Sequence, residues 1–178
     1  MKKVWIGSLV AAVAMFFWGF LFWGATTLPY QVLKPVTDLP ALQQALRAAL
    51  PETGVYLLPH PNQASQEEVA KLMAQGDFGR IIFMREGVQM GGGTFLWGFL
   101  HNLATAFFLA LLLRAAAPSS YGAGLTLVVL AGIAGAIASN LGKPIWYFHP
   151  WGVHMVDFVY DVTLAGVAGL VLAKFVKP

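Results

Sequence analysis

The chain has 178 residues, of which 58% are hydrophobic and only 11% are charged. Soluble domains carry about 25% charged residues, so this composition indicates a protein that crosses a membrane several times. The formal net charge of +3 does not indicate nucleic-acid binding, because the basic residues lie at the ends of apolar stretches rather than in one patch. The absence of cysteine from the sequence excludes disulfides, thiolate metal sites and cysteine nucleophiles.

Residues 1–28 form the first predicted membrane segment. Its apolar part begins after Lys2 and Lys3. A cleaved signal peptide would have a shorter apolar region with small residues at a cleavage site. This stretch is instead rich in phenylalanine and tryptophan, and no such site follows it. The sequence therefore predicts an uncleaved first transmembrane helix, whose aromatic rows we expect to contact lipid and the membrane interface.

Residues 29–93 are the polar segment of the chain, which we expect to form a small α/β cap. Asp38 is placed to cap a first short helix, and Ser65 with Glu68 forms a capping-box pattern that opens a second one. Two short helices and two short strands bury too little surface to fold alone. We expect the cap to pack on the transmembrane helices or on a partner. The predicted elements are helices over about 39–50 and 66–75, and strands over 55–58 and 80–84.

Three further apolar stretches follow the cap, which ends in three consecutive glycines that we interpret as a hinge. They predict transmembrane helices at about 94–114, 121–141 and 153–175, with a loop over 142–152. The fold class predicted is thus an all-α membrane protein, a four-transmembrane-helix bundle with a cap between the first two helices. The third helix has two rows of small residues at i+4 spacing, which allow close helix packing in lipid. The rows are Ala131, Gly135 and Ser139, and Gly132, Ala136 and Asn140.

Basic residues set the expected orientation, because loops on the cytoplasmic side are enriched in lysine and arginine. If the chain crosses the membrane four times, most of the basic residues that flank the helices lie on one side of the membrane. On the other side, Lys143 alone flanks a helix closely. We therefore expect both termini in the cytoplasm and residues 29–93 in the periplasm. The charges on the expected cytoplasmic side are Lys2, Lys3, Arg114, Lys174 and Lys177.

The polar residues of the last three helices gather in the outer half of the predicted membrane region. Charged side chains are costly in hydrocarbon and commonly mark sites, so this cluster is the candidate functional site. The fourth helix carries His154, Asp157 and Asp161 within about 60° of one another around the helix axis. The other predicted members are His101, Asn102 and Thr105 on the second helix, and Ser139, Asn140, Lys143 and His149 on or after the third.

Three interpretations of this cluster stay open at the level of sequence. The residues can hydrogen-bond one another and fix the register of the bundle. Imidazole and carboxylate ligands can instead bind zinc, iron or manganese, and His101, His154, Asp157 and Asp161 form the set proposed for a metal. Haem can be held by His101 together with either His149 or His154. A proton or ion relay is less favoured, because the inner half of the membrane region offers such a relay no polar exit.

A resemblance adds to this picture. Three segments of the sequence carry this resemblance: Trp18-Gly19-Phe20, PETGVYLLPHP at 51–61, and residues 97–113 with Asn102. They resemble a functionally uncharacterised group of small bacterial four-helix inner-membrane proteins. The resemblance implies a bacterial inner-membrane location and a periplasmic insert after the first helix. It implies no catalytic residues, and it does not account for His154, Asp157 and Asp161.

The sequence contains no Ser-His-Asp arrangement, no nucleophile-elbow motif and no paired carboxylates in a soluble cleft. It therefore favours a non-catalytic accessory or assembly subunit of a larger membrane complex. A metal- or haem-binding membrane protein is the first alternative. A protein that binds lipid or a small molecule beneath the cap is the second. The partners expected are membrane lipids and another membrane protein, with no nucleic acid.

Overall fold

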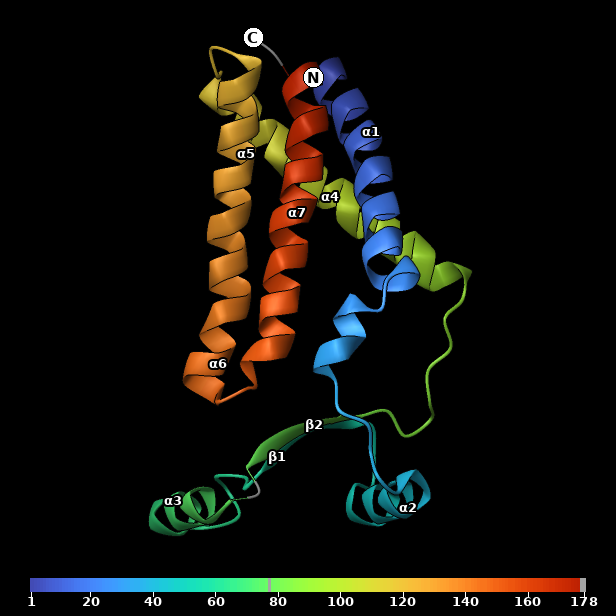
Figure 1. Ribbon diagram of the computed structural model, residues 1–178, viewed down its shortest axis with the longest axis vertical. Coiled ribbons are helices and arrows are strands. Elements are labelled where there is room, and N and C mark those ends of the chain that lie inside the picture. The colour runs from blue at the N-terminus through green and yellow to red at the C-terminus, as the bar shows by residue number, and fades with distance from the viewer. Residues whose placement is uncertain (77, 177–178) are drawn as a thin grey trace. The chain divides into compact units, whose positions relative to one another are not determined.

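The computed structural model describes residues 1–76 and 78–176, so Lys177 lies outside the described residues. The chain divides into a helical unit, Met1–Lys34 with Gly91–Pro178, and an inserted unit, Pro35–Met90. The short 3-10 helix η2 (Leu28–Val32) belongs to the helical unit, although the sequence places these residues at the start of the polar segment. Figure 1 shows the elements of both units in chain order.

The helical unit contains four continuous helical stretches that are long and apolar enough to cross a membrane, counted over the described residues. This confirms the mostly helical architecture expected from the sequence. The first stretch is α1 (Lys2–Gly19) with the π-helical turn η1 (Phe20–Ala25), and the second is α4 (Gly92–Ala116). The third comprises α5 (Tyr121–Ala136), the π-helical turn η3 (Ile137–Leu141) and α6 (Gly142–Tyr147), and the fourth is α7 (Trp151–Phe175).

Two boundaries differ from the sequence prediction. The third stretch continues through the expected loop as α6, and it ends where Phe148 adopts a positive φ of 55°. Gly92 and Gly93 form the first turn of α4 rather than a hinge, and Gly91 is the residue that caps it. In both places glycine or proline suggested a break, but Leu141 and Gly142 keep helical backbone angles and carry the third stretch into α6.

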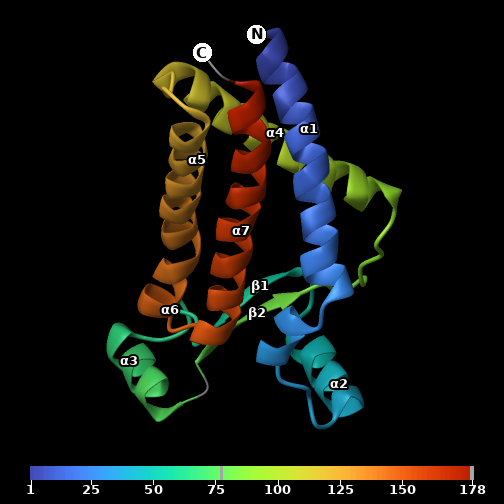
Figure 2. The same ribbon diagram turned by 45° about the horizontal axis from the view of Figure 1, so that its top comes forward.

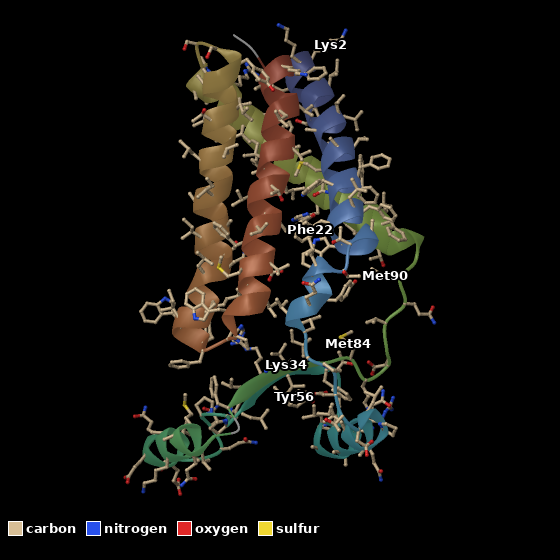
Figure 3. All side chains as sticks on the ribbon, in the orientation of Figure 1. Lys2, Phe22, Lys34, Tyr56, Met84 and Met90 are labelled. Atoms are coloured by element: carbon tan, nitrogen blue, oxygen red, sulfur yellow. The ribbon has the colours of Figure 1, made fainter. Side chains whose placement is uncertain are left out.

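The helices pack in the order α4, α1, α7, α5, and α4 makes few contacts with α5 or α7. In Figures 1 and 2, α5 and α7 run side by side, whereas α4 crosses obliquely. The arrangement is therefore a row of α1, α7 and α5 that α4 crosses, packing mainly on α1 and reaching α5 at Leu113. Figure 3 labels Lys2 and Phe22 near opposite ends of the first stretch.

Small residues hold the helices close together. A Cβ built on Gly132 of α5 would lie 2.1 Å from the Cβ of Ala165 on α7, so the two backbones meet at this point. Buried alanines contribute on α4 and α7, including Ala106, Ala110 and Ala168, which are 0% exposed. The packing matches the mechanism expected where lipid provides no hydrophobic drive between helices.

The inserted unit contains α2 (Leu39–Ala49), β1 (Gly54–Leu58), α3 (Gln66–Gln75) and β2 (Gly79–Phe83). The strands pair antiparallel, with Gly54 opposite Phe83 and Leu58 opposite Gly79. All four elements were predicted to within two residues. Among the described residues of this unit, Leu50 is the one buried side chain, so its own core is minimal.

Local capping explains the helices of this unit. The Asp38 carboxylate accepts a hydrogen bond from the Ala41 amide at 3.0 Å, as predicted. The Ser65 capping box is present, and its hydrogen bonds lower the pKa of Glu68. Arg85 closes the other end of α2, because its Nη1 donates to the carbonyl of Leu50 at 2.8 Å. A hydrogen bond from Thr53 similarly lowers the pKa of Glu86.

Candidate polar site on the α5–α7 side of the helical unit

The first polar contact joins the third and fourth helical stretches. Asn140 lies in the π-helical turn η3 and is 4% exposed. Its Nδ2 donates to Oδ2 of Asp161 on α7 at 2.7 Å. Single π-helical turns frequently occur at functional sites. Because Gly132 and Ala136 allow α5 to approach α7, the short Asn140 side chain reaches the carboxylate directly.

The second polar contact lies near the start of α7. Nδ1 of His149, in the loop before α7, is 2.9 Å from Nε2 of His154. The other ring nitrogen of His154, Nδ1, is 3.7 Å from Oδ2 of Asp157. His154 is 8% exposed, and its Nδ1 has no hydrogen-bond partner among the described residues. The His154 ring thus lies between His149, on its Nε2 side, and Asp157, on its Nδ1 side.

The predicted residues of α4 do not join this arrangement. His101 is exposed, and Asn102 is buried on the face of α4 that also carries Ala106. The Thr105 hydroxyl donates to the His101 carbonyl at 3.0 Å, within its own helix. The separation follows from the packing order, because α4 lies mainly against α1.

This placement revises the two cofactor hypotheses. Among the described residues, no three His, Asp or Glu side chains lie where they could share a metal ion. The four-ligand site of His101, His154, Asp157 and Asp161 is therefore not formed. For haem, the sequence paired His101 with His149 or His154, whereas the structure pairs these last two with each other.

The remaining predicted residues lie outside the two contacts. Lys143 is exposed on α6, and Ser139 is exposed on η3, where its hydroxyl donates to the carbonyl of Ala136. The two small-residue rows of α5 also separate. Gly132, Ala136 and Asn140 face α7, whereas Gly135 and Ser139 are exposed and Ala131 is half-buried. A Cβ on Gly135 would meet nothing within 4 Å.

Sequence reasoning missed an aromatic and polar contact between α1 and α7. Nε1 of Trp18 donates to the Thr163 hydroxyl at 3.1 Å. The Tyr160 ring lies 5.1 Å from that of Phe22 and 5.3 Å from that of Trp23, measured between ring centroids. Some of the aromatic residues expected to contact lipid and the membrane interface therefore also contact α7. The available signal was the need of a buried tryptophan N–H for an acceptor.

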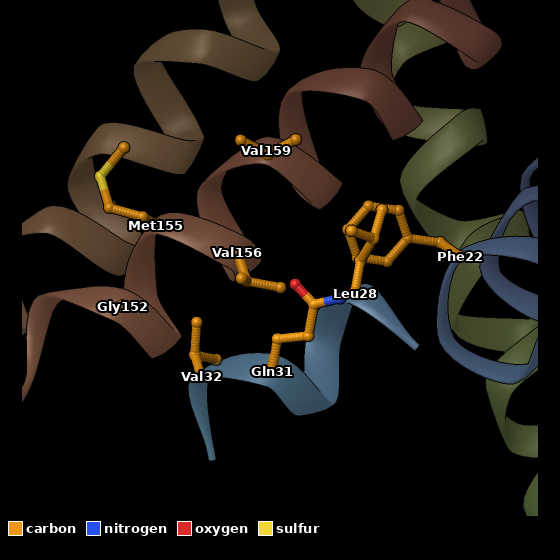
Figure 4. Close-up of a pocket in the computed structure, with 8 residues that line it drawn as sticks. All are labelled: Phe22, Leu28, Gln31, Val32, Gly152, Met155, Val156 and Val159. Carbon is orange, nitrogen blue, oxygen red and sulfur yellow. The ribbon is translucent and has the colours of Figure 1, made fainter. Parts of the chain in front are cut away.

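A groove of about 420 Å³ lies between η1, η2 and the first half of α7. Figure 4 shows it with apolar side chains from both sides and a single polar one, Gln31. It is lined by Phe22, Leu28, Gln31, Val32, Gly152, Met155, Val156 and Val159.

Comparison with known proteins adds no relative. No family model matches the chain, and neither the curated proteins nor the solved structures provide a match.

Proposed function

We propose that this chain is an integral protein of the bacterial inner membrane that docks on a larger membrane complex as a non-catalytic accessory or assembly subunit. In the proposed orientation both termini are cytoplasmic and residues 29–93 are periplasmic. The observation that carries the proposal is the division of α5 into one small-residue row packed on α7 and a neighbouring row left uncovered.

The uncovered row has the properties of a helix-packing surface. Gly135 and Ser139 are exposed one turn apart, and a helix can approach a backbone closely only where side chains are small. The row next to it already packs in this way against Ala165. The second row therefore supports docking of a transmembrane helix from another protein.

The exposed face of α4 also supports a protein partner. On α4 the exposed residues His101, Ala104 and Phe108 share one face. Placing a polar side chain in hydrocarbon is costly, and such residues almost always face protein or water. Because the exposed faces of α4 and α5 differ, contact with unlike partner helices suits this chain better than a symmetric dimer, which would pair one face with itself.

The orientation is supported by charges that gather at one end of the helical unit. Arg114, near the end of α4, contacts the sulfur of Met1, beside Lys2 and Lys3. Lys174 lies in the last turn of α7. Enrichment of basic residues on one side is the property that orients membrane proteins toward the cytoplasm.

Single cysteines test the orientation directly, because the natural chain has none. We expect Ser65→Cys in the inserted unit to react with a membrane-impermeant maleimide in intact cells whose outer membrane has been made permeable. Ser119→Cys, between α4 and α5, should react only after the inner membrane is broken. Labelling of Ser119→Cys before that step would contradict the orientation.

Co-purification tests docking. In mild detergent the natural chain should migrate with a larger complex, and Gly135→Leu should release it while leaving the chain itself folded. Leu130→Ala, which changes an exposed residue on another face of α5, is the matched control and should stay associated. Purification of the natural chain as a single, stoichiometrically pure species would contradict the proposal.

The groove beside η2 favours a second candidate function, the binding of a lipid chain or an apolar small molecule. Its lining is apolar except for Gln31, and its volume of about 420 Å³ falls in the range of ligand pockets. Val156→Trp should fill the groove and reduce the lipid retained by the purified chain, as measured by mass spectrometry. Equal lipid retention by Val156→Trp and the natural chain would contradict ligand binding in this groove.

A further inference from the structure

We propose that the hydrogen bond between His149 and His154 is a pH-sensitive latch. It holds the short connection between α6 and α7 against the first turns of α7, and it opens when both imidazoles carry a positive charge. The latch is independent of the docking function proposed above. Its exposure to the periplasm rests on the orientation proposed there, whereas its response to protons does not.

The two imidazole rings meet end to end. Nδ1 of His149 lies 2.9 Å from Nε2 of His154, and the ring centroids are 5.1 Å apart. At this distance one nitrogen donates a hydrogen and the other accepts it, because two N–H groups would repel each other. The contact therefore persists only while one of these two nitrogens carries no proton.

The position of Asp157 indicates which nitrogen is the acceptor. Nδ1 of His154 is buried and has no hydrogen-bond partner among the described residues, and Oδ2 of Asp157 lies 3.7 Å from it. A carboxylate on this side favours the tautomer that carries its proton on Nδ1. Nε2 of His154 then accepts the hydrogen of His149 Nδ1.

Two successive protons act on this contact in opposite directions. The first can bind Nε2 of His149, because this residue is only half-buried in the connection. A charged donor strengthens a hydrogen bond. The second proton must bind Nε2 of His154, which is the nitrogen that accepts the bond. Two N–H groups and two like charges then face each other, so the contact is lost.

His149 is the member of the pair that can move. It lies in the three-residue connection between α6 and α7, and Phe148 before it has a φ of 55°, which is rare for a bulky residue. His154 is fixed within α7 and is 8% exposed. Release of the latch therefore moves the connection and exposes the His154 ring to water, while both helices stay intact.

The charges around the pair act on His154 from two sides. Lys143 on α6 interacts electrostatically with His154, and its positive charge adds to the repulsion, whereas Asp157 opposes it. Tyr147, also on α6, has its ring centroid 6.1 Å from that of His149. The other charged or titratable residues of α7 and of the elements packed against it are Tyr30 on η2, Lys2 and Lys3 on α1, His101 and Arg114 on α4, Tyr121 on α5, and Tyr160, Asp161 and Lys174 on α7. The charge that His154 experiences is thus set by His149, Lys143 and Asp157.

A spin label beside the pair tests the latch in the purified full-length chain in lipid nanodiscs. Pro150→Cys places the label at an exposed residue of the connection, and the natural chain has no cysteine. An ordinary histidine is half protonated at about pH 6.5, so spectra are compared at about pH 7.5 and about pH 4.5. We expect the label to be mostly immobile at the higher pH and mostly mobile at the lower one, reversibly. Equal mobility at both pH values would overturn the proposal.

Variants of the labelled chain assign the response to the pair. His149→Asn puts an amide at the position of Nδ1, and an amide can donate or accept, so the contact should survive and the label should stay immobile at both pH values. His101→Asn is the matched control on α4 and should respond like the natural chain. Opening of His149→Asn with the natural pH profile, or loss of the response in His101→Asn, would overturn the proposal.

A last variant separates the histidine pair from the carboxylate beside it. Asp157→Asn removes a charge that favours protonated His154, so this chain should stay closed at the higher pH and open about one pH unit lower than the natural chain. If Asp157→Asn is already open at the higher pH, the response belongs to the carboxylate and the latch is wrong.

Discussion

The α5–α7 and α1–α4 helix pairs are similarly apolar, but the polar side chains of the two pairs have different kinds of partner. Between α5 with η3 and α7, Asn140 bonds to Asp161, and His149 pairs with His154 at the start of α7. On α4, Thr105 bonds only to a carbonyl of its own helix, and His101 is exposed. Where the chain supplies no partner for a polar residue within an apolar helix, a second protein is the expected source.

The largest effect should come from breaking the close approach of α5 to α7. In Gly132→Ala the added methyl group would lie 2.1 Å from Cβ of Ala165, so the helices must separate. Overpacking at such a contact costs about 3 kcal/mol, seen as a lower unfolding midpoint in detergent. Gly135→Ala is the matched control, since its methyl group meets nothing within 4 Å. Equal midpoints for the two variants would contradict the packing.

The next largest effect should follow from removing the donor to Asp161. Asn140→Ala leaves a partly buried carboxylate without its 2.7 Å hydrogen bond. Loss of one partner from a buried pair costs about 1–3 kcal/mol in unfolding free energy. Ser139→Ala, one residue earlier, removes only an exposed hydroxyl and should change little. If the two variants unfold alike, the Asn140–Asp161 contact does not join the helices.

A smaller effect should appear between α1 and α7. Trp18→Phe removes the N–H that donates to Thr163, and Thr163→Val removes the acceptor. A double-mutant cycle should give a coupling of about 0.6 kcal/mol, the average for hydrogen bonds inside membrane proteins. A coupling of zero, with the aromatic contacts to Tyr160 intact, would show that the hydrogen bond contributes nothing.

The smallest effect should be on the exposed face of α4. His101→Leu removes an exposed side chain that joins neither polar contact of α7. The isolated chain should therefore change by less than about 0.5 kcal/mol in unfolding free energy, as surface substitutions usually do. A loss of unfolding free energy as large as that of Asn140→Ala would show that His101 has a stabilising contact within the chain. The α1–α4 pair would then not differ from the α5–α7 pair in this respect.

Local signals made much of the fold predictable. Asp38 and Ser65 cap their helices as expected, because capping depends on residues three positions apart. The four apolar stretches were visible in composition alone. The helix through α6 was missed, because Gly142 and Pro144 suggested a loop, whereas the backbone stays helical through Leu141 and Gly142.

The site was less predictable, because it depends on how distant helices pair. Helical spacing placed His154, Asp157 and Asp161 on one face, and the small row with Asn140 indicated close packing. Nothing in the sequence showed that α4 packs on α1, which separates His101 from the group. The meeting of His149 with His154 depends on the tight connection after Phe148, whose left-handed conformation is rare for a non-glycine residue.

The most direct test of the account is a crosslinking measurement on the uncovered row of α5. A photoreactive maleimide is attached to Gly135→Cys in native membranes, with Leu130→Cys, at an exposed position on another face of α5, as the control. Only the introduced cysteine reacts within the chain, since the natural sequence has none. The account predicts that Gly135→Cys forms a discrete adduct with another membrane protein and that Leu130→Cys does not. Crosslinking of both positions to lipid alone would contradict it.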